Sequence, residues 1–144
     1  MKKASQIAKA FLKLSQPEAG DAITNLKLQK LLYYAQGFHI AIHNKPLFKE
    51  NLLAWEHGPV VKEVYGIYSG FSSESIPVPE EKIVLTKKEQ ELVSSVWKVY
   101  GQFSAWRLRE MSHNESPWIS TERNKIISHK KLSDFFKTQL VDNE

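Results

Sequence analysis

Residues 25–43 of the chain read NLKLQKLLYYAQGFHIAIH and show the strongest helical pattern in the sequence. Apolar side chains recur at three- and four-residue spacing, which is typical of one face of a helix, at Leu28, Leu31, Leu32, Ala35, Phe38 and Ile42. Thr24 precedes the segment as a suitable N-cap, and Pro46 follows it. Tyr34 and Ile40 carry apolar character beyond this face. We therefore expect residues 25–43 to form the core helix of the domain.

Shorter helices are predicted before and after this segment. Residues 3–14 place Ile7, Phe11 and Leu14 on one face. Thr86 and Glu89 match a capping box, which predicts a helix that runs to about Tyr100 with its apolar face inward. Further helices are predicted at 59–68, 105–111 and 129–138, separated by a loop at 69–84 and a turn at 113–116. Residues 141–144 are expected to fray.

The segment after the core helix is short and irregular. Leu47, Leu53 and Trp55 suit a short β-hairpin or an extended loop. Pro59 suits the first position of a helix, which should bury Ile67 and Tyr68. The sequence thus predicts a mainly α protein, a single compact helical domain over residues 1–144, with about six helices and one short β-hairpin or extended element near residues 47–56.

The composition limits the possible functions. A chain of 144 residues with 42% hydrophobic and 25% charged residues is typical of one globular domain. The absence of cysteine excludes disulfides, thiolate metal sites and a cysteine nucleophile. No apolar run reaches the roughly 20 residues that a membrane helix needs, and lysines interrupt the N-terminal segment, so a cytoplasmic protein without membrane contact is expected.

The net charge of +4 is mild, and the excess of lysine lies mostly in the first fifty residues. Such a bias can support weak, salt-sensitive contact with nucleic acid, but a solvated surface that keeps the protein soluble explains it better. A separate DNA-binding domain is not expected. DNA binding by the lysine-rich first helix stays a minor alternative.

Known catalytic motifs are missing from the sequence, including phosphate-binding loops, the nucleophile elbow and the H-E-x-x-H zinc motif. His39 and His43 lie one helical turn apart and could share a metal ion, but helix capping or surface roles are favoured because no third ligand is evident. No metal and no cofactor are therefore expected.

Two further segments contain residue types that serve chemistry or recognition. His113 and Glu115 could form an acid–base pair, although a structural turn that holds Pro117-Trp118 is favoured. The segment 54–61, AWEHGPVV, joins an aromatic residue, a charge pair and a Gly58-Pro59 corner. Gly58 is expected to be extended because it precedes proline. A fold-specific corner is favoured here over a recognition surface.

Four motifs together resemble the Panacea domain of the SocA-like antitoxin family, also known as phage-associated proteins. Residues 28–39 resemble the K-L-Q-K-L-L-Y-Y-A-Q-G-W-H signature, and residues 45–48 resemble an R-P-L-F turn. Residues 54–61 resemble A-W-x-x-G-P-V-V, and residues 112–118 resemble T-H-x-E-x-P-W. The motifs occur in order, and the resemblance extends over nearly the whole chain.

The resemblance implies an antitoxin without enzymatic activity, which neutralises a cognate protein toxin, encoded next to it, by direct contact. The alternatives are a proteolytic adaptor that delivers the toxin to a cytoplasmic protease, a DNA-binding regulator and an enzyme that uses His113 and Glu115. The residues predicted to contact the toxin are conspicuous aromatic, histidine and glutamate side chains: Trp55, His57, Tyr65, Tyr68, Phe71, His113, Glu115 and Trp118.

Overall fold

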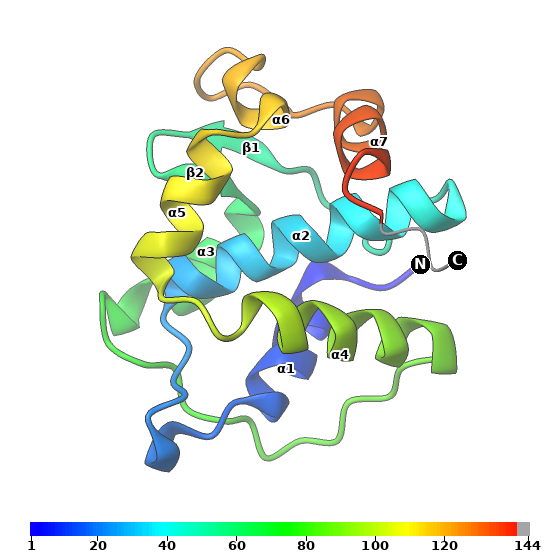
Figure 1. The fold of residues 1–144 in the computed structure, drawn as a ribbon. Helices are drawn as coiled ribbons and strands as arrows, with labels where there is room; N and C mark the ends of the chain where they lie inside the picture. The colour runs from blue at the N-terminus through cyan, green and yellow to red at the C-terminus, as the bar shows by residue number, and fades with distance from the viewer. Residues whose placement is uncertain (141–144) are drawn as a thin grey trace.

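The computed structural model describes residues 1–140 and confirms a mainly α protein. Within these residues, the chain forms seven α-helices and one small antiparallel sheet, which lies at the edge of the molecule (Figure 1). The elements are α1 (Ala4–Leu14), α2 (Asn25–His43), β1 (Leu53–Trp55), β2 (Gly58–Val60), α3 (Lys62–Tyr68), α4 (Lys87–Tyr100), α5 (Ala105–His113), α6 (Ser116–Ile119) and α7 (His129–Lys137), with 3-10 turns η1 (Pro17–Ala19) and η2 (Ser69–Phe71). The predicted fraying of residues 141–144 lies outside the described part of the chain.

Helix α2 is the central element, as the sequence predicts. It packs against α1, α3, α4, α5, α7 and β2 (Figure 1). The Thr24 side chain accepts a hydrogen bond from the Lys27 backbone amide and so caps the helix. Every residue from Asn25 to Gly37 is buried except the partly buried Leu26. Ile42 was predicted to be buried but is 51% exposed, because it lies on the side of the last turn of α2 that faces solvent.

Most polar residues of α2 are also buried, because they bind the backbone of other segments. Lys27 Nζ donates to the Gly101 carbonyl oxygen at 2.7 Å, just after α4. The Gln36 amide donates to the Phe48 carbonyl and accepts from the Leu47 and Phe48 amides. These bonds satisfy backbone groups that would otherwise be unpaired in the interior, and they fix the turn after α2 to its flank.

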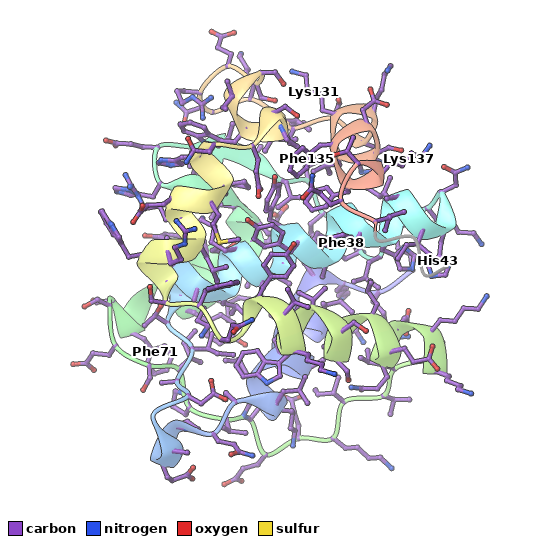
Figure 2. The ribbon with its side chains drawn as sticks, in the orientation of Figure 1. Phe38, His43, Phe71, Lys131, Phe135 and Lys137 are labelled. Atoms are coloured by element: carbon purple, nitrogen blue, oxygen red, sulfur yellow. The ribbon has the colours of Figure 1, made fainter. Side chains whose placement is uncertain are left out.

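Helix α7 closes one side of α2. Phe38 and Phe135 lie at this contact (Figure 2), and the rings of Phe38 and Phe136 meet edge to face with centroids 4.9 Å apart. Gly37 allows the approach, because a Cβ atom there would lie 2.1 Å from the Phe136 ring. The two helices, about 100 residues apart in sequence, therefore pack with a ring directly on the backbone.

The β-element is a hairpin, but it covers residues 53–60, later in the chain than the predicted range of 47–56. Leu53 pairs with Val60 and Trp55 pairs with Gly58, so Pro59 lies in strand β2 and does not begin a helix. Helix α3 begins at Lys62 instead. The other edge of β1 binds residues 124–127 through the backbone of Leu52 and Ala54. Ile67 was predicted to be buried, but it lies 56% exposed on the outer face of α3.

The remaining boundaries agree closely with the sequence predictions. The Thr86–Glu89 capping box is present with both hydrogen bonds, and Ser104 and Ser128 cap α5 and α7. The predicted turn at 113–116 is shorter, because α5 continues to His113 and α6 begins at Ser116. No helix in residues 1–140 combines the length and the apolar character needed to span a membrane.

Candidate functional site

The α2 side chains Gln29 and Lys30 hold strand β2 in place. Gln29 Oε1 accepts a hydrogen bond from the Val61 amide at 2.8 Å, and its Nε2 donates to Asn25 Oδ1. Lys30 Nζ donates to the Pro59 carbonyl oxygen at 2.9 Å. Two adjacent polar residues of the core helix thus fix the hairpin and the start of α3 against α2.

Gly58 is required where the hairpin meets α2 and α5. Its φ of +108° lies in a region that residues with a Cβ rarely adopt, so the simple extended conformation expected before proline is wrong. A Cβ atom at this position would also lie 2.8 Å from both Lys30 Cε and Ser112 Oγ. The hairpin can therefore approach the Lys30 side chain only with glycine here.

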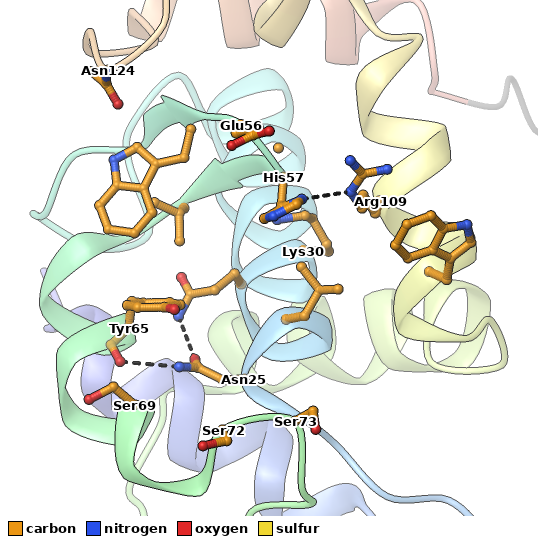
Figure 3. Close-up of a pocket in the computed structure, with 16 residues that line it drawn as sticks. Asn25, Lys30, Glu56, His57, Tyr65, Ser69, Ser72, Ser73, Arg109 and Asn124 are labelled. Atoms are coloured by element: carbon orange, nitrogen blue, oxygen red, sulfur yellow. Dashed lines mark hydrogen bonds between the residues drawn. The ribbon is translucent and has the colours of Figure 1, made fainter.

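A surface pocket of about 560 Å³ lies between this hairpin, α3 and α5 (Figure 3). Trp55, His57 and Tyr65 line it, so three of the predicted contact residues are brought together. The Trp55 and Tyr65 rings meet edge to face with centroids 5.2 Å apart. Hydroxyl groups from the segment after α3 form part of the wall, at Ser69, Ser72 and Ser73.

Basic and aromatic residues of α5 complete the pocket. Arg109 Nε donates to His57 Nδ1 at 3.1 Å, and its guanidinium lies 4.5 Å from the centre of the Trp106 ring (Figure 3). The Trp106 side chain is 59% exposed. Lys30 lines the same pocket from α2, and burial lowers the pKa of its amine to about 7, with a smaller contribution from the Arg109 charge.

His113 and Trp118 form a structural corner beneath the hairpin. Their rings stack with centroids 4.1 Å apart, and Arg123 lies 3.7 Å from the centre of the Trp118 ring. Trp118 Nε1 donates to the Trp55 carbonyl oxygen at 2.7 Å. Burial lowers the pKa of His113, and the Arg109 charge adds to this effect. Neither residue lines the pocket, although Trp118 supports the strand that carries Trp55.

Glu115 faces α2 instead. Its carboxylate accepts hydrogen bonds from the hydroxyls of Tyr33 at 2.9 Å and Tyr34 at 3.0 Å. Burial raises the pKa of Glu115 to about 7, against the opposing effect of the two tyrosine hydrogen bonds. His113 and Glu115 therefore contact different partners, and Glu115 also lies outside the pocket.

The other predicted contact residues lie apart from the pocket. Tyr68 is buried in the core at the end of α3, and Phe71 is 36% exposed in η2 with its ring centroid 6.5 Å from that of Tyr68. The His39 and His43 rings lie 4.7 Å apart, and His39 Nδ1 contacts the Lys45 carbonyl oxygen. No cluster of three or more His, Asp or Glu side chains suited to a metal ion occurs in residues 1–140.

Sequence reasoning missed several residues of the pocket, among them Lys30, Trp106 and Arg109. A signal for two of them was present, because Trp106 and Arg109 are three residues apart and so share a face of α5. That face is opposite the buried Leu108. Lys30 gave no such signal, since a lysine in an amphipathic helix is normally expected to reach solvent.

These features define a compact helical scaffold whose motif residues shape a basic, aromatic pocket. The chain matches the family described as "Antitoxin SocA-like, Panacea domain" over residues 28–119, and it belongs to that family. The matched range contains all four motifs, so the resemblance seen in the sequence is confirmed.

A curated relative is "Antitoxin SocA" of Caulobacter vibrioides (strain NA1000 / CB15N). It is 33% identical over 109 residues, an alignment that covers 67% of this chain and 58% of the relative. The chain thus spans somewhat more than half the length of that relative. No solved structure matches the chain.

Proposed function

We propose that this protein is an antitoxin that neutralises a cognate protein toxin by binding it through the surface around the pocket. Membership of the SocA-like family supports an antitoxin role. The observation that carries the choice of surface is the pair of exposed aromatic side chains, Tyr65 and Trp106, at the pocket that also contains Trp55. Tryptophan, tyrosine and arginine contribute most often to the binding energy of protein interfaces.

The interior contacts support this function because they make the surface rigid before a partner arrives. Gln29 and Lys30 fix β2, and Trp118 holds the backbone of Trp55. A surface that is already ordered loses less conformational entropy on binding. In this proposal residues 1–140 act as one binding domain, the action is steric, and the family motifs maintain the shape of the binding surface without carrying out a reaction.

The proposal is tested by expressing the neighbouring open reading frame alone and together with this protein. Growth arrest by the neighbour and its relief by this protein are expected. Trp106→Ala and Tyr65→Ala should lose the relief while keeping the wild-type circular dichroism spectrum, because the two residues are 59% and 41% exposed and lie outside the core. Ile42→Ala, at a 51% exposed site on the last turn of α2, is the control and should relieve arrest normally.

Absence of growth arrest, or arrest that this protein fails to relieve, would contradict the proposal. The lifetime of the toxin separates masking from delivery to a cytoplasmic protease. Masking predicts the same toxin half-life in cells with and without the protease. Delivery predicts a toxin that is degraded only when both the protease and this protein are present.

A further inference from the structure

The pocket contains a buried amine that no carboxylate neutralises. Lys30 is only 1% exposed, and its one hydrogen bond in residues 1–140 goes to the neutral Pro59 carbonyl. An ammonium group has three donors, so donors are left over. None of the ion pairs within the described chain involves Lys30. Charged side chains that are buried without a counter-ion are costly and often belong to functional sites.

Arg109 has unused donors at the same pocket. Only its Nε forms a hydrogen bond within residues 1–140, to His57 Nδ1, and no ion pair there involves its guanidinium. Because His57 Nδ1 accepts this bond, the His57 ring is left with a donor at Nε2. Figure 3 shows Lys30, His57 and Arg109 close together between the hairpin and α5. Glu56 also lines the pocket, but it pairs with neither cation.

The rest of the lining suits an apolar body attached to an acidic group. Trp55, Tyr65 and Trp106 supply aromatic surface, and the volume of about 560 Å³ can hold one or two side chains. A planar guanidinium stacked on an aromatic ring is well suited to bind a carboxylate through two hydrogen bonds. Cations and aromatic rings therefore converge on one recess.

We infer that this recess receives an acidic side chain of the toxin, together with an apolar residue beside it. The inference rests on the proposed function and names the chemistry of the contact. The toxin carboxylate accepts hydrogen bonds from the Arg109 guanidinium, and the buried Lys30 amine adds a favourable charge, while the neighbouring apolar residue packs against the aromatic rings. The added negative charge would also favour the protonated form of Lys30 and restore its pKa toward the ordinary value.

The distribution of charged side chains around the pocket favours a protein partner over a nucleic acid. The cations form one recess, and acidic side chains lie beside it: Glu56 lines the pocket and Glu110 follows Arg109 on α5. An extended polyanion is normally bound by a stripe of lysine and arginine that follows its backbone. A single acidic side chain needs only one such group of cations.

The test compares two arginines of α5 by calorimetric titration with the purified cognate toxin. Arg109→Gln is expected to weaken binding about 10-fold and Arg109→Glu at least about 100-fold, because loss and then reversal of a charge at a desolvated contact have increasing cost. Arg107→Gln is the matched control. Arg107 lies outside the pocket and near Glu110, and its substitution should change the affinity by less than about twofold.

Two further measurements test the same contact in other ways. Lys30→Met should also weaken binding, and its thermal unfolding shows whether the hairpin is still folded. Replacement of the contacting toxin acid by lysine should restore binding to Arg109→Glu. Equal affinity of the Arg109→Gln, Arg107→Gln and wild-type proteins for the toxin would overturn the inference and leave the proposed function intact. Failure of the wild-type protein to bind the toxin would instead overturn the proposed function.

Discussion

At the residue scale, glycines determine how closely the elements of this protein approach one another. Gly37 and Gly58 each lie where a Cβ atom would meet another group, the Phe136 ring in one case and the side chains of Lys30 and Ser112 in the other. Gly66 in α3 has open space around it. The sequence alone does not show which of the three glycines is closely packed. The structure shows that Gly37 and Gly58 are and that Gly66 is not.

Gly37→Ala should destabilise the protein by about 2 kcal/mol or more, because the new methyl group overlaps a ring held in the core. Urea unfolding followed by circular dichroism measures the change. Gly66→Ala is the control, and it should leave stability unchanged or raise it by up to about 1 kcal/mol because alanine is the better helix former. Equal stability of the two variants would contradict the close packing of α7 on α2.

Glu115 should make stability depend on pH. Its pKa is raised to about 7 in the folded protein, so between pH 4.5 and 7 the folded state binds more protons than the unfolded state. Stability from this group is therefore present at low pH and is lost as the pH rises, by about 2 kcal/mol between pH 5 and pH 7.

Glu115→Gln removes this titration, and urea midpoints at pH 5 and pH 7 measure it. The difference between wild type and variant isolates Glu115, because the lowered pKa values of His39 and His113 act in both proteins. The variant should gain stability relative to wild type as the pH rises. A pH-independent difference would show that Glu115 titrates normally.

At the element scale, α2 joins the structure through its polar side chains as well as its apolar ones. The sequence predicts the bounds of α2 and its central position correctly. Its apolar residues cover more than one face of the helix, as expected for a helix that is surrounded by others. The pattern could not show that Gln29, Lys30 and Gln36 are buried, since their burial depends on backbone groups of distant segments. The prediction that Pro59 begins a helix was wrong for a similar reason. The preference of proline for the first position of a helix is outweighed by the pairing of Leu53 with Val60, which a local pattern does not show.

Gln36→Ala should destabilise the protein by about 3 kcal/mol. The substitution leaves the buried amides of Leu47 and Phe48 and the Phe48 carbonyl without partners, and each unpaired buried group costs about 1–3 kcal/mol. Chemical unfolding measures the loss. Gln90→Ala, where the amide bonds only to Ser94 at the surface, should change stability by less than about 0.5 kcal/mol.

At the scale of the whole molecule, the hydrophobic core includes residues on both sides of the segment that matches the family. The single core cluster extends from Ala4 to Phe136, whereas the match covers residues 28–119. Helices α1 and α7 lie outside the match, yet they cover α2 with Phe11, Leu12, Leu132 and Phe136. Stability is therefore a property of the longer segment.

A fragment restricted to residues 28–119 should not fold cooperatively, because two faces of α2 become exposed and the Thr24 cap is lost. Thermal unfolding by circular dichroism should show a broad, shallow change where residues 1–140 show a sharp transition. A sharp transition in the fragment would demonstrate that α1 and α7 are dispensable for folding.

The pocket shows why a site is harder to predict than a fold. Trp55 and His57 were predicted from one short motif, but Lys30 and Arg109 come from α2 and α5, about 80 residues apart. Periodicity predicts which residues share one helix face. It does not predict which faces of different elements meet, so the cationic side of the pocket could not be assembled from spacing alone.

The central position of α2 also determines the order in which the protein opens. Its amide hydrogens are covered on several sides by other elements, so they can reach water only when the whole core separates. In heavy water they should be replaced by deuterium last, at a rate that reports global unfolding. The hairpin turn and the segment after α3, both exposed beside the pocket, should exchange far sooner, and a bound partner would slow exchange there first.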